Sequence, residues 1–326
     1  MKEYKWATLG CGVIANQLAQ AFAANGRKLY SVANRTHEKA VAFAEKYGID
    51  KVYDQIDDVF SDDEVDIIYI STPHNTHISY LRKALSAGKH VLCEKSITLN
   101  AEELEEAVRL AEEHHVVLAE AMTIFHMPIY KELRSRMDTG EFGELRLLQM
   151  NFGSYKEYDM KNRFFNRNLA GGALLDIGVY ALSIVRSFLD EQPDEIMSQW
   201  KPSPTGSDEQ ATILLKNTQG QMATVALSMH SKQPKRAMIS LEKGYIEIME
   251  YPRADKAVIV DAESGVQTEI TAGDTADALY YEMQDMEQAV KSGDASAMQL
   301  AYSKDVMEIM TKLRKDWGMK YPGEAW

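Results

Sequence analysis

The chain has 326 residues, of which 45% are hydrophobic and 26% are charged, and its formal net charge is −13 at pH 7. This composition is typical of a globular protein, and the length favours two domains. The acidic excess argues against a nucleic-acid surface or an anionic-membrane surface, since both need a basic face. We find no apolar run near the roughly 18 residues needed to cross a bilayer.

The first residues begin a strand and leave no room for a signal peptide, so we expect a cytoplasmic protein. Cys11 and Cys93 are the only cysteines and do not form a disulfide framework. The acidic run at 61–64 is expected to be a solvated turn, because adjacent carboxylates do not all converge on one ion. The sequence therefore predicts no metal site, no nucleic-acid partner and no membrane partner.

A glycine turn follows a predicted strand at 6–9 and precedes a predicted helix at 14–22. Gly10, Gly12 and Ala15 have the G-x-G-x-x-A spacing of a dinucleotide-binding turn. Gly10 permits the tight turn, and Gly12 lets the backbone approach a pyrophosphate. A turn that merely joins strand to helix is the alternative, but the flanking elements favour cofactor binding.

Val13, just before that predicted helix, and Ile14, its first residue, are expected at the phosphates, because a helix N-terminus offers unpaired N–H groups. A second strand is predicted at 28–33, and helices are predicted at 38–47 and 57–60.

The tip of the second strand bears on the choice of cofactor. NAD-selective folds usually place a carboxylate there to bind the ribose 2′-hydroxyl. This tip is Asn34-Arg35-Thr36, with no carboxylate before Glu38. Arg35 suits a 2′-phosphate, although a solvated arginine is the simpler reading. We predict NADP rather than NAD.

The nearly continuous apolar run at 66–71 predicts a buried parallel strand. It ends in a loop that contains Thr72, Pro73, His74 and His77. Because ligands of doubly wound sheets bind at the carboxyl ends of strands, we expect this loop near the cofactor. His77 has a plain alternative as a helix-cap or loop residue.

The next strand, at 89–93, brings Glu94 and Lys95 to the same edge of the sheet. A lysine in such a loop is usually a surface residue, but the glycine turn and the Thr72 loop should open to the same crevice. A capped helix from Asn100 to His115 and a strand at 116–120 complete two β-α-β halves. Residues 1–121 are thus expected to form a Rossmann dinucleotide-binding domain.

Residues 122–326 are expected to form a second α/β domain with a large, mainly antiparallel open sheet. The predicted strands are at 144–153, 194–200, 210–216, 222–229, 237–241, 245–249 and 258–260. The predicted helices are at 128–137, 173–189, 276–291 and 297–317. Helices gathered on one face leave the other face in need of a partner, which suggests a homodimer through this sheet.

The helix predicted at 173–189 carries Asp176 and Tyr180, four residues apart and so on one face. In isolation, an inward tyrosine beside a capping aspartate would be the simpler reading. The surrounding motifs favour a chemical role.

Four segments together resemble the Gfo/Idh/MocA family, the glucose–fructose oxidoreductase and inositol dehydrogenase group. The four are Gly10-Cys11-Gly12-Val13-Ile14-Ala15, Thr72-Pro73-His74-Asn75-Thr76-His77, Cys93-Glu94-Lys95-Ser96 and residues 169–180. The family has a Rossmann domain and an α/β domain whose open sheet forms dimers. The resemblance implies that Lys95 is the catalytic lysine, that Asp176 helps to bind substrate and that position 180 is the acid–base residue.

Two departures accompany the resemblance. Many members have histidine at position 180, whereas Tyr180 is similar to the dihydrodiol dehydrogenase and D-xylose–NADP dehydrogenase branch. Ser96 replaces the proline of the family's Glu-Lys-Pro motif, which puts the rigidity of the Lys95 loop in question.

We therefore expect a hydride-transferring enzyme acting on a secondary alcohol or carbonyl of a sugar, polyol or trans-dihydrodiol-like compound. Tyr180 would be the acid–base group, assisted by the Lys95 ammonium, with Asp176 orienting a hydroxyl. Arg163 and Asn168 are further candidates for polar contacts. A dinucleotide-binding regulator without chemistry, and a lyase or glycosidase that uses NAD transiently, are the alternatives.

Overall fold

The computed structural model describes residues 3–324 and 326, which form two compact units. The first unit holds the described residues up to Met122 together with Leu279–Leu300. The second holds Thr123–Ala278 and the described residues from Ala301 onward. The expected division placed residues 122–326 in one domain. The structure instead assigns Leu279–Leu300 to the first unit.

The first unit is built on a six-stranded parallel sheet with the order β3-β2-β1-β4-β5-β6. This is the doubly wound order, with a crossover between β1 and β4, and it confirms the predicted Rossmann fold. The strands are β1 Trp6–Leu9, β2 Ser31–Ala33, β3 Lys51–Val52, β4 Ile67–Ile70, β5 His90–Glu94 and β6 Leu118–Ala121. The helices are α1 Val13–Ala24, α2 His37–Tyr47, α3 His77–Ser86, α4 Ala101–Glu113 and α7 Ala278–Ser292.

Helix α7 packs into the same hydrophobic core as β1 and α1, which lie far from it in the sequence. Its residues Met283 and Met286 are fully buried in the same cluster as Trp6 of β1 and Phe22 of α1. The Trp6 indole Nε1 also donates a hydrogen bond to Glu287 Oε1 at 2.8 Å. Residues from near both ends of the chain therefore make one core.

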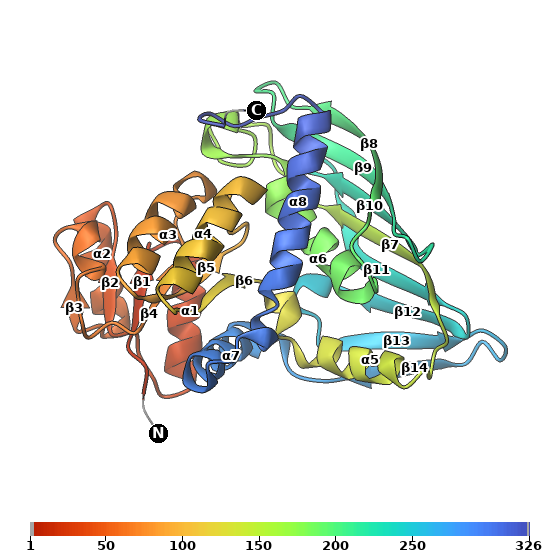
Figure 1. Ribbon diagram of the computed structural model, residues 1–326, viewed down its shortest axis with the longest axis horizontal. Coiled ribbons are helices and arrows are strands. Elements are labelled where there is room, and N and C mark those ends of the chain that lie inside the picture. The colour runs from red at the N-terminus through yellow and green to blue at the C-terminus, as the bar shows by residue number, and fades with distance from the viewer. Residues whose placement is uncertain (1–2, 325) are drawn as a thin grey trace. The chain divides into compact units, whose positions relative to one another are not determined.

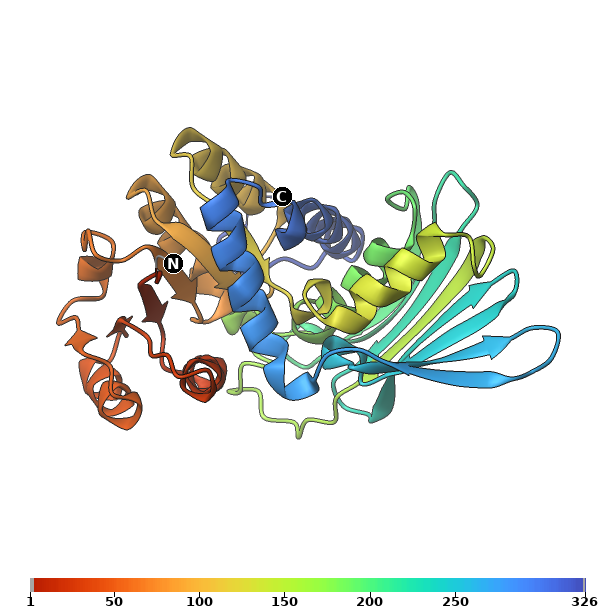
Figure 2. The same ribbon diagram turned by 90° about the horizontal axis from the view of Figure 1, so that it is seen from below.

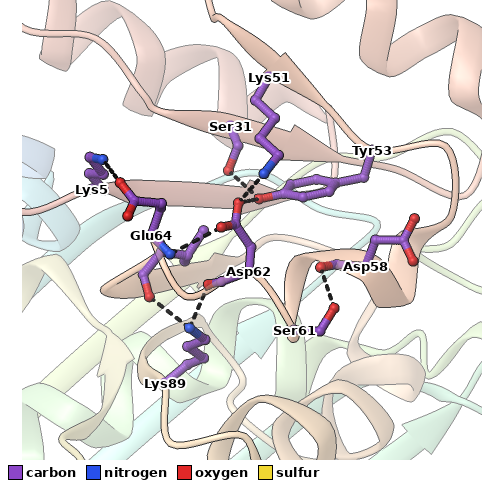
Figure 3. A network of polar contacts seen from close by, with 10 residues as sticks. Lys5, Ser31, Lys51, Tyr53, Asp58, Ser61, Asp62, Glu64 and Lys89 are labelled. Carbon is purple, nitrogen blue, oxygen red and sulfur yellow. Dashed lines mark hydrogen bonds and ion pairs between the residues drawn. The ribbon is translucent and has the colours of Figure 1, made fainter.

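The acidic run at 61–64 is more structured than the sequence suggests (Figure 3). The Asp62 carboxylate is 7% exposed and accepts hydrogen bonds from Lys51 Nζ at 2.6 Å and from the Tyr53 hydroxyl at 2.5 Å. Burial alone would raise its pKa, but these contacts, with the N–H of Glu64, lower the pKa of Asp62 to about 2. The expectation of a solvated turn is wrong for Asp62.

The second unit has an eight-stranded sheet with the order β14-β13-β12-β11-β7-β10-β9-β8. Only β7 and β10 pair in parallel, so the predicted mainly antiparallel sheet is confirmed for the described residues. The strands are β7 Leu145–Gly153, β8 Glu195–Pro202, β9 Asp208–Lys216, β10 Met222–Ser228, β11 Gln233–Leu241, β12 Gly244–Met249, β13 Lys256–Asp261 and β14 Gln267–Thr271. Strand β14 is not among the strands predicted from the sequence.

The helices of the second unit, α5 Pro128–Asp138, α6 Val179–Phe188 and α8 Leu300–Asp316, lie on one face of its sheet (Figure 1). The turned view shows α5 running along the same face (Figure 2). Along β9, buried and exposed residues alternate, as expected for a sheet with one covered face. In the described residues the opposite face stays open and exposes Met197, Leu214 and Met222.

One stretch, Arg167–Phe188, is long and apolar enough to meet a criterion for a membrane-spanning helix. In its most apolar window, however, 78% of the residues are buried inside the protein. This stretch, which ends in α6, therefore belongs to the buried core of the second unit.

Candidate active site

The glycine turn at the end of β1 is tight at Gly10 and open at Gly12. Gly10 has φ of +110°, and a Cβ there would lie 2.8 Å from the Ser71 side-chain oxygen, so only glycine fits without strain. Gly12 is different, because nothing lies within 4 Å of the position of its Cβ. Gly12 is also the N-cap of α1, and no described side chain caps that helix. Open space beside uncapped N–H groups suits a phosphate.

Val13 and Ile14 are the first two residues of α1, and Val13 is 79% exposed. Their contact with the cofactor phosphates remains a prediction. The neighbouring Cys11 is half-buried, and burial raises the pKa of its thiol to about 11. The thiol is therefore neutral near pH 7 and does not add negative charge to the turn.

The tip of β2 lies next to the glycine turn, since the Gly10 N–H donates to the Ala33 carbonyl at 2.8 Å. Asn34 is half-buried, and its side-chain amide donates to the carbonyl of Thr36 at 2.9 Å. Arg35 and Thr36 are exposed. The exposed guanidinium is thus held on an ordered tip at the edge where the cofactor is expected.

The loop after β4 contacts the loop after β5 through two histidines. His74 Nε2 lies 2.9 Å from the carbonyl oxygen of Lys95. His77 Nδ1 lies 3.0 Å from the carbonyl oxygen of Ser96, and its Nε2 lies 2.8 Å from that of Thr72. A carbonyl only accepts, so the ring nitrogen must carry the proton in each bond, and a neutral His77 ring, which has one N–H, donates to one of its two carbonyls at a time.

His77 has no exposed surface, whereas Thr72 and His74 are half-buried and Pro73 is exposed. Burial is the largest influence on His77 and lowers its pKa, although the carbonyls around it act in the opposite direction. A role for His77 in cofactor binding remains a prediction. The contacts of His74 and His77 with the backbone carbonyls hold the Thr72 loop against the Lys95 loop.

The Lys95 loop is fixed from two sides. The histidines hold its carbonyl oxygens, and the N–H of Ile97 donates to Glu120 Oε1 at 3.0 Å. The peptide bond between Lys95 and Ser96 is cis. These hydrogen bonds order the backbone around Lys95 although serine replaces the proline of the motif.

Within the ten residues from Val91 to Asn100, Glu94 and Lys95 are the only ones that are not buried. The Glu94 carboxylate accepts from the Tyr69 hydroxyl, and its second oxygen lies 3.3 Å from the N–H of Lys95. The fold therefore buries the segment around Lys95 and leaves that side chain accessible.

In the second unit, too, a buried segment contains a few residues that are not buried. Leu174–Gly178 forms a π-helical turn, and α6 follows directly from Val179. Of the fifteen residues from Gly171 to Val185, thirteen are buried, and the two exceptions are Asp176 and Tyr180. A packing role does not explain why only these two residues of the Gly171–Val185 segment are not buried.

Tyr180 contacts an aromatic ring, and Asp176 contacts a charged group. The Tyr180 ring packs against Phe152 of β7, with ring centroids 6.2 Å apart. The Asp176 carboxylate is 13% exposed, and its Oδ1 lies 3.5 Å from Arg163 Nη1. Arg163 is therefore close to Asp176, whereas Asn168 lines a separate cavity of about 490 Å³ with Arg167 and Lys320.

Two buried carboxylates beside these segments were not singled out as site residues. Glu120 braces the Lys95 loop, and Asp208 accepts a hydrogen bond from the N–H of Leu174 at 2.6 Å. Burial raises the pKa of Asp208 to about 7, against the lowering effect of nearby N–H groups and of Arg314. Asp208 stands at the start of a strand, and nothing in the local sequence links it to the helix 34 residues away.

Comparison with known proteins agrees with this arrangement. Residues 4–122 match the family model described as "Oxidoreductase family, NAD-binding Rossmann fold". Residues 130–247 match the model described as "GFO/IDH/MocA C-terminal domain". The two models match in this order and cover most of the chain. The chain belongs to the Gfo/Idh/MocA oxidoreductase family.

Curated relatives in this family extend over nearly the whole chain. The trans-1,2-dihydrobenzene-1,2-diol dehydrogenase of Xenopus tropicalis is 28% identical over 329 residues, which cover 98% of this chain and 99% of the relative. The mouse (Mus musculus) enzyme of the same name is 28% identical over 330 residues, with 98% of each chain covered.

Solved structures show the same fold. A 3-ketoreductase from Actinomadura kijaniata, in complex with NADP and TDP-benzene, matches with a TM-score of 0.86 at 22% identity, covering 96% of this chain and 98% of that one. The UDP-N-acetylglucosamine 3-dehydrogenase of Acidithiobacillus ferrooxidans matches with a TM-score of 0.81 at 22% identity, covering 97% and 98%. The predicted resemblance is confirmed, and this Gfo/Idh/MocA member is an NAD(P)-dependent oxidoreductase.

Proposed function

We propose that this Gfo/Idh/MocA protein interconverts a secondary alcohol and a carbonyl on a sugar, a polyol or a trans-dihydrodiol-like compound. The proposal rests on which residues of two buried segments are exposed to solvent. Lys95 and Tyr180 are accessible within segments that are otherwise almost fully buried. The names of the dihydrodiol dehydrogenase relatives support a vicinal diol as one substrate class.

A bound nicotinamide dinucleotide would supply the hydride acceptor or donor, held by Gly12, Val13 and Ile14 at its phosphates. Tyr180 Oη takes the hydroxyl proton during oxidation and returns it during reduction. The Lys95 ammonium stabilises negative charge on the developing alkoxide and favours the phenolate form of Tyr180. The Asp176 carboxylate accepts a hydrogen bond from a neighbouring substrate hydroxyl and so orients the reacting carbon.

The test is turnover of purified variants with a panel of polyols, aldoses and trans-dihydrodiols, followed by nicotinamide absorbance. Tyr180→Phe and Lys95→Ala should each lower kcat at least about 100-fold, the usual size of an acid–base contribution. Tyr155→Phe, at an exposed tyrosine of the same unit, and Lys83→Ala, at an exposed helix lysine, are the matched controls.

Near-normal turnover by Tyr180→Phe would refute its assignment. Product formation without a net absorbance change would indicate transient redox chemistry, as in a lyase or glycosidase. Cofactor binding without any turnover across the panel would favour a regulator.

For the cofactor we propose a preference for NADP. The support is the exposed Arg35 on an ordered tip that has no carboxylate before Glu38. Arg35→Ala should raise KM for NADP about 10-fold or more while leaving KM for NAD nearly unchanged, since a charge-assisted bond to the 2′-phosphate is lost. A higher kcat/KM with NAD in the unaltered protein would refute this preference.

We also propose a homodimer through the open sheet. Register places Met197 opposite Leu214 and Met222 opposite Leu147 on the uncovered face, so apolar side chains run across neighbouring strands. A mass in solution of about twice the 36.8 kDa of the chain is expected. Leu214→Asp should return it to the monomer mass, and a monomeric unaltered protein would refute the proposal.

The proposed setting is the cytoplasm. Cys11 and Cys93 are both free thiols, which agrees with a reducing compartment.

A further inference from the structure

The start of the helix that bears Asp176 and Tyr180 is held by a side chain from the sheet. Asp208 is the first residue of β9 and has no exposed surface. Its Oδ2 accepts the N–H of Leu174 at 2.6 Å. Leu174 opens the π-helical turn on which Asp176 lies, and Tyr180 follows as the second residue of α6.

Gly172 provides the room for this contact. Its φ is +136°, and a Cβ at that position would lie 1.9 Å from Asp208 Oδ1. The carboxylate thus occupies the place where a side chain of residue 172 would be. The backbone conformation and the contact both require glycine at this position.

The loop before the helix is held from the same side. The turn between β8 and β9 contributes Ser207, whose hydroxyl donates to the carbonyl of Phe165 at 3.1 Å. The Tyr321 hydroxyl donates to the carbonyl of Gly171 at 3.0 Å. Asp208 is the member of this set that reaches the helix itself, and a carboxylate is favourable at the positive end of a helix.

We propose that Asp208 is a positioning residue, whose buried carboxylate fixes the first turn of this helix and thereby orients Asp176 and Tyr180 toward the substrate. The inference rests on the proposed function for its catalytic consequence. The structural part, an ordered helix start, stands separately and has its own measurement.

Two variants distinguish positioning from general stability. Asp208→Ala removes the acceptor for the Leu174 N–H, whereas Asp208→Asn keeps an oxygen in that place. Asp274→Ala is the matched control, because the Asp274 carboxylate caps a short helix elsewhere in the second unit by accepting from Ala276 N at 2.8 Å. All proteins are compared at a temperature well below the lowest unfolding midpoint.

Amide hydrogen exchange of the 172–180 segment is the first readout. Asp208→Ala should speed exchange there at least about fivefold, the effect of losing a typical helix cap, while Asp208→Asn and Asp274→Ala leave that segment unchanged. Unchanged exchange in Asp208→Ala overturns the inference. This readout needs no substrate, so it decides the structural part even if the unaltered protein turns over nothing in the panel.

Steady-state kinetics are the second readout. Asp208→Ala should lower kcat about 10-fold or more and raise KM for the alcohol, with KM for the cofactor unchanged, because misplaced groups lose catalysis steeply. Asp208→Asn should recover most of the lost kcat. A kcat within about twofold of the unaltered protein, or a parallel loss of cofactor affinity, overturns the positioning role.

Discussion

Asp62 offers a sharp test of how buried charge stabilises the first unit. Its carboxylate is nearly inaccessible and accepts from Lys51 Nζ, the Tyr53 hydroxyl and the N–H of Glu64. Asp62→Asn removes the negative charge while keeping the size of the side chain. The exposed neighbour Asp63 supplies the control, since Asp63→Asn changes the net charge equally without touching this network.

The magnitude follows from the pKa of Asp62, which is lowered from 3.8 to about 2. A difference of about 1.8 pH units, at about 1.4 kcal/mol for each, corresponds to roughly 2.5 kcal/mol of unfolding free energy. Because the folded-state pKa is the lower one, this stabilisation is fully present above about pH 4. It is lost as the pH falls through about 2.

Urea unfolding at pH 7 and pH 3, followed by intrinsic tryptophan fluorescence, measures the difference between the unaltered protein and each variant. Asp62→Asn should be less stable by roughly 2.5 kcal/mol at pH 7 and by about half of that at pH 3. Asp63→Asn should stay within about 0.5 kcal/mol at both values. An Asp62→Asn deficit of the same size at both pH values would refute the electrostatic reasoning.

Three further outcomes follow from the site. Gly10→Ala should lower the Tm and weaken dinucleotide binding, whereas Gly12→Ala should weaken binding with little change in Tm; a fluorescence titration and thermal unfolding compare the two. His77→Phe, which removes the ring nitrogens that contact the loop carbonyls, should lower kcat about 10-fold, as stopped assays will measure, and a cofactor titration of the same variant tests the predicted role of His77 in cofactor binding. As the pH rises from about 4 to about 7, the unaltered protein should lose stability relative to Asp208→Asn. The reason is that the pKa of Asp208 is higher in the folded protein, so that over this range the carboxyl ionises more readily in the unfolded chain, which favours unfolding. Unfolding curves of the two proteins, measured in parallel over this pH range, check the sign.

Much of the fold follows from local patterns in the sequence. The run at 66–71 is apolar and β-branched, and it forms the central strand β4 at Ile67–Ile70. The glycine turn likewise lies between β1 and α1, as its spacing predicts. These features can be predicted from the sequence because a strand buried on both faces, or a turn with positive φ, restricts the residue types at each position.

The features that the sequence did not reveal depend on distant partners. Strand β14 has a single large apolar residue, Ile270, and is nearly all exposed, so no alternation marks it. Asp62 has the composition of a solvated turn, and only the approach of Lys51 and Tyr53 buries it. Asp208 meets the helix start across 34 residues, a pairing that no local periodicity encodes.

The path of the chain has a consequence for how the protein can be made. It passes between the two units three times, after Met122, after Ala278 and after Leu300. A fragment that ends near residue 122 would lack Met283 and Met286 and would leave the apolar surface around Trp6 open to water. During synthesis the core of the first unit cannot be completed until Met283 and Met286 have left the ribosome. Its folding is thereby tied to synthesis of the second unit up to Ala278.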